Sequence, residues 1–449
     1  MNNSINWLYE RFQGSPYRLA FIHENREVTY GQVTNLINDF YDQITSSGIA
    51  PGELVVVAGD YSPEIFCVFL ALAKNQNIII PITKNSVVEE DSALEVSGCD
   101  WRINFNNMDG CIHIDAYKVA NNNQLVEGLR EAKAPGLILF SSGSTGKPKG
   151  ILHDFNRVMH KFRTERPPIS AIPFLMIDHF GGINTILAIT SGLGTVVTVS
   201  DRSVLKICEA IEKFKVELLP ATPSFLNLLI ASKIYENYDL SSLKRITYGT
   251  EVMPQSTLDR IHQIFSHVKL LQTYGLSEVG VLHSKSKGDG STWVKIGGEG
   301  FQTKVIDGIL WIKSAYAMVG YLNAPSDFDE EGWFNTHDQV EIDGEFFRIL
   351  GRETEIINTG GQKVYPAEIE SVILDLENIE DVAVFGEKHA LLGQMIVAKI
   401  LLKTPESSDS VKKRVRTACL LVLAPFKAPS KIILSNAPLY SIRQKKIRR

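Results

Sequence analysis

Apolar and polar residues alternate along the first part of the chain with the periods expected of short strands and amphipathic helices. Continuous apolar runs at 54–58 and 78–82 predict buried strands, and the apolar stretch 65–73 between them predicts a helix. A strand, a helix and a second strand in this order imply parallel pairing through a right-handed crossover. The pattern therefore predicts an α/β fold.

The same alternation of strand-like and helical patterns occurs in the middle of the chain. Strand-like runs cover 195–199, 216–220, 245–248 and 268–272, and helical patterns cover 204–214 and 224–232. Ligands of open α/β sheets gather at the carboxyl ends of the strands. We therefore expect a binding site near Tyr248-Gly249-Thr250 and Thr273-Tyr274-Gly275.

Beyond about residue 285 glycines separate shorter strand-like runs such as 305–312 and 344–350, which predicts a small β-rich subdomain. The segment after Gly351-Arg352 has its own helix pattern at 367–376 and strand pattern at 382–385. We therefore expect two domains. A large N-terminal domain (1–350) would combine mostly parallel α/β subdomains with the β-rich subdomain, and 351–449 would form a small, mobile α+β C-terminal domain.

Composition narrows the class of protein. The 449 residues include 46 basic and 51 acidic side chains, for a formal net charge of −5, so no strong positive field would attract nucleic acid. No apolar window approaches the length of a membrane span, and the N-terminus lacks a basic region followed by an apolar core. These features predict a cytoplasmic protein without a membrane span.

The cysteines are odd in number and scattered, and they form no C-x-x-C pair. They are Cys67, Cys99, Cys111, Cys208 and Cys419. This distribution predicts reduced structural thiols and no zinc site.

The clearest motif follows the apolar run 136–140, where nearly every side chain of 141–150 is glycine, hydroxyl or ammonium. Glycines bring main-chain N–H groups close to an oxyanion, while hydroxyls and lysines donate further bonds. A flexible surface turn is the alternative, but two lysines around a proline directly after a strand pattern favour phosphate binding. The spacing differs from the usual P-loop, because only Ser144 and Thr145 separate Gly143 from Gly146.

Two further segments carry residues suited to a nucleotide. In 272–278, Glu278 and a hydroxyl offer oxygen ligands for Mg²⁺ beside phosphates, although Tyr274 alone reads equally well as a core aromatic. Asp338, at the end of 332–338, precedes Arg352 by fourteen residues. Asp338 can accept and Arg352 can donate hydrogen bonds to sugar hydroxyls. For an isolated pair, however, a plain surface salt bridge is commoner. Two more segments stand out. One is 358–370, which contains a glycine turn and Pro366, and the other is a basic tail at 445–449.

In this order and spacing, the motifs 141–150, 274–278, 332–338 and 351–370 resemble those of the adenylate-forming superfamily: acyl-CoA synthetases, peptide synthetase adenylation domains and luciferases. The resemblance runs from about residue 27 to the end. It implies an ATP-dependent acid–thiol ligase that forms an acyl-adenylate, releases pyrophosphate and passes the acyl group to coenzyme A. The implied cofactors are ATP, Mg²⁺ and coenzyme A.

The resemblance also assigns roles by motif. The phosphates of ATP would be held by Ser141, Ser142, Gly143, Ser144, Thr145, Gly146 and Lys149. Thr145 and Glu278 would lie near the metal and take part in catalysis. The adenine would be lined by Gly249, Thr250, Glu251 and Tyr274, and the ribose would be held by Asp338 and Arg352. Lys446 would be the C-terminal lysine that acts at the α-phosphate and the substrate carboxylate.

This chain departs from the family pattern at three places. Lys445 stands where the family has glycine before the catalytic lysine, and the spacing from Pro438 is stretched, so Lys445 is a rival to Lys446. His337 replaces the usual glycine before Asp338, and Thr354 stands where the hinge commonly has Asp or Lys. These changes put the catalytic lysine and the second half-reaction in doubt, but not the fold.

The substrate is expected to be a small carboxylic acid bound beside 173–184 and the strand end at Tyr248. The segment 177–184 supplies an aromatic and two glycines but no cation, which favours an apolar or aromatic monocarboxylic acid. His179 matches the family position that gates the pocket, although a packed core histidine is nearly as common. Transfer to an acyl or peptidyl carrier protein or to an amine, and a nucleotide-binding protein without turnover, remain alternatives.

Overall fold

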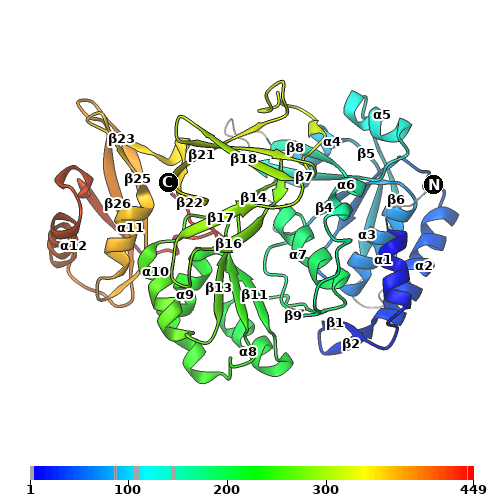
Figure 1. Ribbon diagram of the computed structural model, residues 1–449, viewed down its shortest axis with the longest axis horizontal. Coiled ribbons are helices and arrows are strands. Elements are labelled where there is room, and N and C mark those ends of the chain that lie inside the picture. Colours follow the sequence, from blue (N-terminus) through cyan, green and yellow to red (C-terminus); the bar gives the residue numbers. More distant parts are fainter. Residues whose placement is uncertain are drawn as a thin grey trace. The chain divides into compact units, whose positions relative to one another are not determined.

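The computed structural model describes residues 5–84, 86, 88–105, 112–142, 148–441 and 443–448. Its contacts divide the chain into two compact units, each built from several segments. Unit 1 consists of Met1–Pro220, Gly275–Val281 and Lys313–Phe334; unit 2 consists of Ala221–Tyr274, Leu282–Ile312 and Asn335–Arg449. Figure 1 labels the elements of both units.

Unit 1 alternates helices with short strands over most of its length. Its helices are α1 (Asn6–Gln13), α2 (Tyr30–Ser46), α3 (Pro63–Lys74), α4 (Glu90–Ser97), α5 (Gln124–Glu131), α6 (Phe155–His160), α7 (Phe180–Ser191) and α8 (Val204–Phe214). Its strands are β1 (Leu19–His23), β2 (Arg26–Thr29), β3 (Leu54–Ala58), β4 (Ile78–Ile82), β5 (Cys99–Phe105), β6 (Ile112–Val119), β7 (Gly136–Ser142), β8 (Pro148–Asp154), β9 (Ser170–Ala171), β10 (Thr195–Val197), β14 (Gly275–Leu276), β15 (Gly280–Val281) and β20 (Gly320–Tyr321), and β11 (Leu218–Ala221) lies at its boundary.

A seven-stranded sheet in the order β20-β8-β7-β4-β3-β5-β6 forms the centre of unit 1. The predicted parallel pairing is confirmed, with Leu54 of β3 opposite Ile78 of β4. Successive residues of β3 face opposite sides. Val55 and Val57 pack in the core that includes α2 and α3, and Leu54 and Val56 pack in the core that includes α4 and α5. Burial on both faces explains why this strand is a continuous apolar run.

The second sheet portion of unit 1 holds β1, β2, β9 and β10. β10 pairs in parallel with β1 and with β9, whereas β2 pairs antiparallel with β1. The predicted strand at 195–199 is confirmed as the shorter β10, and the predicted helix at 204–214 is confirmed as α8.

Unit 2 contains fewer helices and more antiparallel strands. Its helices are α9 (Pro223–Ser232), α10 (Gln255–Ile264), α11 (Pro366–Leu374) and α12 (Ser408–Val422), with 3-10 turns η1 (Ile234–Asn237), η2 (Glu353–Glu355) and η3 (Pro425–Lys427). Its strands are β12 (Arg245–Tyr248), β13 (Lys269–Gln272), β16 (His283–Ser286), β17 (Trp293–Gly297), β18 (Phe301–Ile306), β19 (Ile309–Ser314), β21 (Phe334–Asp343), β22 (Phe346–Arg352), β23 (Ile357–Thr359), β24 (Gln362–Val364), β25 (Ile379–His389), β26 (Gly393–Leu402) and β27 (Lys431–Ser435).

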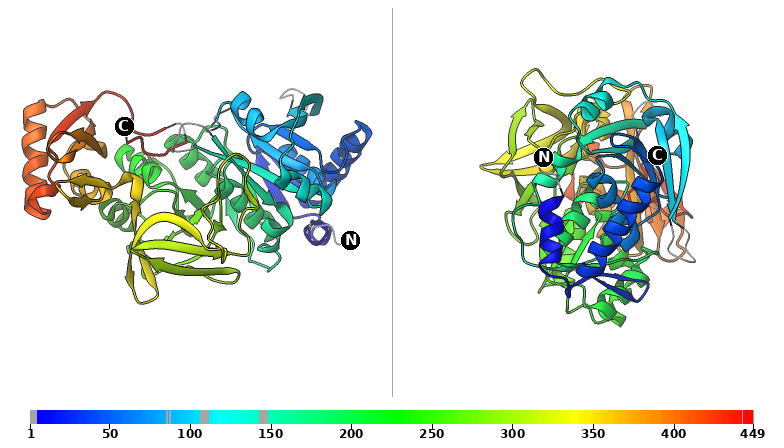
Figure 2. Two further views of the ribbon diagram at one scale, coloured as in Figure 1. Left: turned by 90° about the horizontal axis from the view of Figure 1, so that it is seen from above. Right: turned by 90° about the vertical axis from the view of Figure 1, so that its right-hand side faces the viewer.

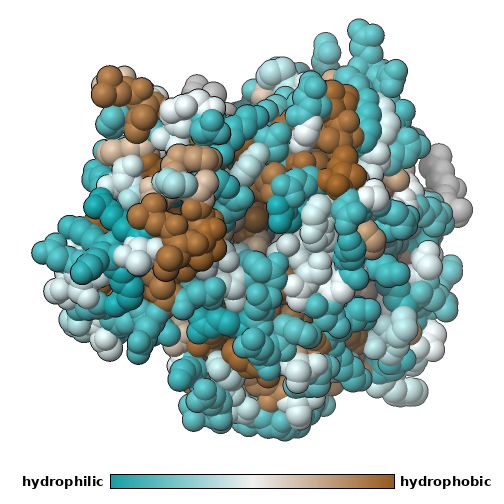
Figure 3. Space-filling model, turned by 60° about the vertical axis from the view of Figure 1, so that its left-hand side comes forward, coloured by the Kyte–Doolittle hydropathy of each residue, from teal (hydrophilic) through white to brown (hydrophobic). Residues whose placement is uncertain are grey.

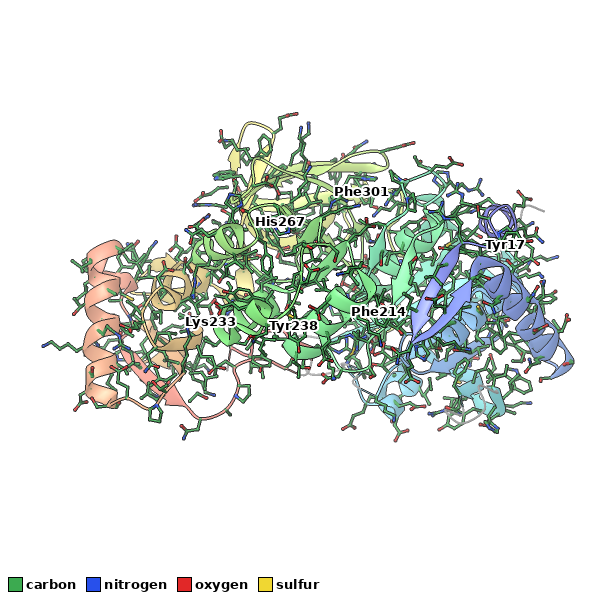
Figure 4. The ribbon with its side chains drawn as sticks, turned by 90° about the horizontal axis from the view of Figure 1, so that it is seen from below. Tyr17, Phe214, Lys233, Tyr238, His267 and Phe301 are labelled. Carbon is green, nitrogen blue, oxygen red and sulfur yellow. The ribbon has the colours of Figure 1, made fainter. Side chains whose placement is uncertain are left out.

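The predicted β-rich subdomain is the six-stranded sheet β16-β17-β22-β21-β19-β18. One detail of the prediction was wrong, because 305–312 is not a single run. The chain turns at Asp307 and Gly308, whose φ angles of 51° and 78° are typical of a two-residue hairpin turn between β18 and β19. Figure 4 labels Phe301, the first residue of β18.

The C-terminal segment folds as a sheet covered by two helices, which we call the C-terminal module (357–435). β25 and β26 pair antiparallel along their lengths, β27 pairs in parallel with β26, and α11 and α12 share a core with these strands. Figure 2 shows the longer helix, α12, beside the strands of this module. The predicted helix 367–376 is α11, and the predicted strand 382–385 is the longer β25. The compact units do not divide at residue 350, so that domain boundary stays a prediction.

Cys67, Cys99, Cys208 and Cys419 are free and buried, whereas Cys111 lies outside the described residues. Within the described chain, no helix is both long enough and apolar enough to cross a membrane.

Apolar side chains reach the surface in separate patches on the face shown in Figure 3. Over the described residues, the most exposed large apolar side chains include Leu391, Leu421 and Val422, at 90%, 80% and 71%. All three belong to the C-terminal module.

Candidate active site

The predicted phosphate loop lies at the tip of an antiparallel hairpin in unit 1. β7 and β8 pair from Gly136 opposite Asp154 to Ser142 opposite Pro148, and Ser141 lies opposite Lys149. Gly143, Ser144, Thr145 and Gly146 lie outside the described residues, so their role at the phosphates and the metal stays a prediction. The hairpin nevertheless places Ser141, Ser142 and Lys149 at the base of this loop.

Tyr321 connects the base of the hairpin to Glu278. The Tyr321 hydroxyl donates a hydrogen bond of 2.8 Å to Glu278 Oε1, and the Lys149 ammonium lies 4.7 Å from the centre of the Tyr321 ring. β20 carries Tyr321 and pairs with β8, so that Tyr321 lies opposite Ile151. A carboxylate, an ammonium and a phenol therefore meet beside the predicted phosphate loop.

This cluster suits a magnesium-bound phosphate. Mg²⁺ is usually held by one or two carboxylates together with substrate phosphates, and Glu278 supplies one carboxylate. Among the described residues, no group of three or more His, Cys, Asp or Glu side chains is placed to hold a metal by itself. Tyr321 was not predicted, because its sequence signal is only a tyrosine after a glycine in a two-residue strand.

His179, the predicted gate of the acid pocket, begins helix α7. Its Nδ1 accepts a hydrogen bond of 3.0 Å from the N–H of Gly181, which makes it the N-cap of the helix. A Cβ on Gly182 would lie 2.0 Å from the Met176 carbonyl oxygen, so only glycine fits at that turn. His179 therefore has a structural role at the start of α7, and its gating role stays a prediction.

A buried histidine that was not predicted packs beside this helix start. The ring of His153 lies 4.9 Å from that of Phe180, and the side chain is fully buried. Burial lowers the pKa of His153 to about 3, and neither ring nitrogen has a hydrogen-bond partner among the described residues. His153 is therefore neutral at physiological pH.

One lysine from outside segment 177–184 contacts it. Segment 177–184 contains none, but Lys161 reaches it from the end of α6, where its ammonium donates to Asn184 Oδ1 at 3.0 Å and to the Val281 carbonyl. Burial lowers the pKa of Lys161 to about 7, and Arg166 adds to that decrease. An amine that is only partly charged near neutral pH thus contacts the segment that was expected to lack a cation.

The two predicted ribose residues lie together in unit 2. Asp338 of β21 and Arg352 of β22 face each other in register, and Arg352 Nε lies 3.5 Å from Asp338 Oδ1. The hydroxyl of Tyr274 also donates to Asp338. Asp338 is buried, and this burial raises its pKa above the ordinary value. A buried carboxylate with two donors differs from a plain surface salt bridge, so this arrangement favours a binding role.

Backbone strain marks the same region. His337, which replaces the family glycine before Asp338, has a φ of 56°, and Thr250 has a φ of 70°. Non-glycine residues in this left-handed region cost free energy and cluster at functional sites. A Cβ on Gly249 would lie 2.6 Å from the Thr273 carbonyl oxygen, which explains the glycine there.

Glu251, predicted to line the adenine, contacts Ser224 and the C-terminal tail. Its Oε2 accepts hydrogen bonds from the Ser224 hydroxyl at 2.8 Å and the Ser224 N–H at 3.2 Å. Its Oε1 accepts a bond of 2.5 Å from the N–H of Lys446. The adenine-binding roles of Gly249, Thr250 and Glu251 stay predictions.

The two rival lysines have different surroundings. The Lys446 ammonium donates to Asp381 Oδ1 at 2.8 Å and to the Val382 carbonyl at 2.7 Å, and the Lys446 and Asp381 side chains are only 6% and 3% exposed. Burial acts to lower the pKa of Lys446, but Asp381 and Glu370 together raise it. Lys446 is therefore bound within the C-terminal module.

Lys445 instead interacts electrostatically with Glu251 and with Arg352 of the ribose pair. Burial lowers its pKa, the Glu251 carboxylate opposes that decrease, and Arg352 adds to it. The assignment of Lys446 as the catalytic lysine stays a prediction, but these surroundings favour Lys445.

A small open pocket lies beside Arg352 in unit 2. Among its lining residues are Val252, Gly351, Tyr365 and Arg448.

Comparisons with known proteins agree with the motifs. Residues 8–322 match the family described as AMP-binding enzyme, and residues 368–441 match the AMP-binding enzyme C-terminal domain. The chain belongs to the AMP-binding enzyme family. Because the first match alone covers more than half of the chain, the resemblance to adenylate-forming enzymes is confirmed.

Relatives of this AMP-binding enzyme extend over most of its length. An indoleacetate–CoA ligase of Aromatoleum aromaticum is 26% identical, over 88% of this chain and 87% of its own. A long-chain-fatty-acid–CoA ligase of Mycobacterium tuberculosis is also 26% identical, over 97% of this chain and 95% of its own.

A solved structure resembles the AMP-binding enzyme equally extensively. The anthranilate–CoA ligase AuaEII, in complex with anthranoyl-AMP, has a TM-score of 0.84 at 19% identity, over 99% of this chain and 96% of its own. At this identity the likeness confirms the α/β fold alone.

Proposed function

We propose that this AMP-binding enzyme is an ATP-dependent carboxylic acid ligase that forms an acyl-adenylate and transfers the acyl group to coenzyme A. The observation that carries the proposal is the cluster of Glu278, Tyr321 and Lys149 at the base of the glycine- and hydroxyl-rich loop. The buried Asp338 beside Arg352 supports the same reading for the nucleoside.

In the first half-reaction a carboxylate oxygen of the acid attacks the α-phosphorus of ATP, and the bond between that phosphorus and the bridging oxygen to the β-phosphate breaks. The electron pair leaves with pyrophosphate. Two anions must meet, so nearby cations lower the barrier. We assign this role to the Lys445 ammonium, and Mg²⁺ held by Glu278 would supply further positive charge at the phosphates.

In the second half-reaction the sulfur of coenzyme A attacks the acyl carbonyl carbon. The bond from that carbon to the phosphate oxygen of AMP breaks, so AMP leaves and the thiol proton passes to solvent or a base. The named activities of the relatives, on indoleacetate and on long-chain fatty acids, support an apolar or aromatic monocarboxylic acid as substrate.

The test is pyrophosphate release from ATP and Mg²⁺ over a panel of aromatic, aliphatic and dicarboxylic acids, with and without coenzyme A. The proposal expects acid-dependent release and a thioester product. Release without a thioester would instead favour a carrier-protein thiol or an amine as acceptor. Nucleotide binding without release for any acid would identify a homologue without turnover.

A further inference from the structure

We propose that Glu251 is a positioning residue that holds the C-terminal tail so that Lys445, and not Lys446, faces the nucleotide-binding residues. The inference rests on the proposed adenylation and adds a role that the family motifs do not give to Glu251. It begins from the contacts of the tail (436–448) within unit 2.

The tail is tied to loops that follow two consecutive strands. Glu251 comes three residues after β12 and accepts the Lys446 N–H at 2.5 Å. Thr222 comes directly after β11, and its hydroxyl donates to the Gln444 carbonyl at 2.6 Å. The carboxyl ends of such strands are where ligands bind in α/β sheets, so these two bonds hold the tail at the expected binding edge.

The tail itself is a tight turn under strain. The N–H of Ser441 donates to the Lys445 carbonyl at 2.7 Å, and Tyr440 and Lys446 form an antiparallel bridge. Gln444 has a φ of 56°, in the left-handed region. A non-glycine residue persists there only where its surroundings impose the conformation. The bonds from Thr222 and Glu251, on either side of the turn, provide that restraint.

Lys446 is held at both ends. Its N–H bonds to Glu251, and its ammonium bonds to Asp381 of β25. Two residues later, Arg448 bonds to the Glu370 carboxylate of α11 at 3.0 and 3.1 Å. The tail is thus anchored to the C-terminal module through charged pairs.

This anchoring gives the two lysines different surroundings. The Lys446 ammonium is bound to Asp381 of the module. The charges that act on Lys445 are those of Glu251, Arg443 and Arg352 instead.

The charges around Lys445 explain why the positioning residue is a carboxylate. Arg352, Arg443 and burial all act against a protonated amine at this position, and Glu251 opposes them. Glu251 therefore has two effects on Lys445: its hydrogen bond fixes the main chain, and its charge favours the ammonium form needed beside a phosphate.

Three variants separate these effects. Glu251→Gln keeps an acceptor for the Lys446 N–H but removes the charge, and Glu251→Ala removes both. Glu377→Gln, at an exposed residue of the C-terminal module, is the matched control for loss of a carboxylate. Each is combined with Lys445→Met.

The first readout does not require activity. The pH dependence of Lys445 labelling by an amine-selective reagent, measured by mass spectrometry, reports its titration. Glu251→Gln should move the midpoint down by about one pH unit, the lower end of the effect of a nearby opposite charge. The Glu377→Gln midpoint should stay where it is in the parent.

The second readout is acid-dependent exchange of pyrophosphate into ATP. Glu251→Ala should lower the maximal exchange rate about tenfold or more. The rate of exchange should fall as alkaline pH deprotonates Lys445, and Glu251→Gln should move this fall to lower pH. In the Lys445→Met background, neither Glu251 variant should lower the exchange rate further.

An unmoved Lys445 titration in an enzyme that exchanges pyrophosphate overturns the role of Glu251 alone. The role of Glu251 is also overturned if its variants lower the exchange rate by the same factor in the Lys445→Met background as in the parent. Glu251 would then act independently of Lys445. A parent enzyme that exchanges nothing with any acid overturns the proposed function, and with it the catalytic role of Lys445.

Discussion

Replacing Lys446 by methionine should destabilise the C-terminal module far more than the same change at Lys445. The Lys446 ammonium lies 2.8 Å from the Asp381 carboxylate, and both side chains are almost fully buried. At an effective dielectric constant near 20, the attraction between unit charges at that distance is about 6 kcal/mol before desolvation. The loss expected on removing one partner of such a pair is about 3–5 kcal/mol, because the other charge stays buried and uncompensated.

This stabilisation is fully present at neutral pH. The folded state raises the pKa of Lys446 above its unfolded value, so the pair stabilises the fold from neutral pH up to the ordinary lysine pKa. Its contribution is lost only as the pH rises through the raised pKa. The folded state lowers the pKa of Lys445, so removing that amine has no comparable cost.

Hydrogen exchange of the β25 amides measures the difference directly. A loss of about 3–5 kcal/mol in local stability speeds exchange by about a hundredfold or more. Lys446→Met should show this increase, and Lys446→Met with Asp381→Asn should recover part of the protection because no unpaired charge remains. Lys445→Met should keep parental exchange and lose the adenylation rate. A stable but inactive Lys446→Met would refute the reasoning and return the catalytic role to Lys446.

Three further changes test other parts of the site. Tyr321→Phe removes the hydroxyl that donates to Glu278, so the KM for Mg²⁺·ATP should rise about tenfold, as expected for one hydrogen bond to a charged group; an unchanged KM would separate Tyr321 from the phosphate site. Asp338→Asn should weaken the binding of adenosine nucleotides by a similar factor in calorimetry, whereas unaltered affinity would place the ribose elsewhere. His153 is neutral in the folded state, with a pKa of about 3, and protonates near 6.5 when unfolded. Stability should therefore fall by up to about 1.4 kcal/mol per unit as the pH drops below about 6.5, and His153→Phe should flatten that part of the urea-denaturation profile; an identical profile in the variant would assign the loss to other groups.

The elements that the sequence predicted well are those buried on both faces or strongly periodic. β3 and β4 are continuous apolar runs, and their parallel pairing followed from the helix between them. The Asp307-Gly308 turn was missed although Asp-Gly between apolar runs is a strong hairpin signal. There the apolar composition of 305–312 hid a turn that the two residues themselves specify.

The site residues that belong to a sequence motif could be predicted from the sequence. Asp338 and Arg352 were expected together, and the antiparallel register of β21 and β22 places them opposite each other. Tyr321 was missed because it acts through a two-residue strand whose pairing with β8 is not visible in sequence. Contacts between distant segments of the chain depend on packing, which local patterns do not encode.

The two adjacent lysines show a second limit. A motif can place a lysine within one residue, but two neighbouring lysines can have different surroundings. Only the position of Asp381, sixty-five residues away in the sequence, shows which of the two lysines is bound within the C-terminal module.

The central claim is that the chain activates a carboxylic acid by forming an acyl-adenylate. The most direct measurement is mass-spectrometric detection of acyl-AMP after a single turnover with ATP, Mg²⁺ and an aromatic or aliphatic acid, without coenzyme A. The account predicts an acyl-AMP that appears with equimolar pyrophosphate and is lost in Lys445→Met. Failure to detect acyl-AMP with any acid, from an enzyme that binds ATP, would contradict it.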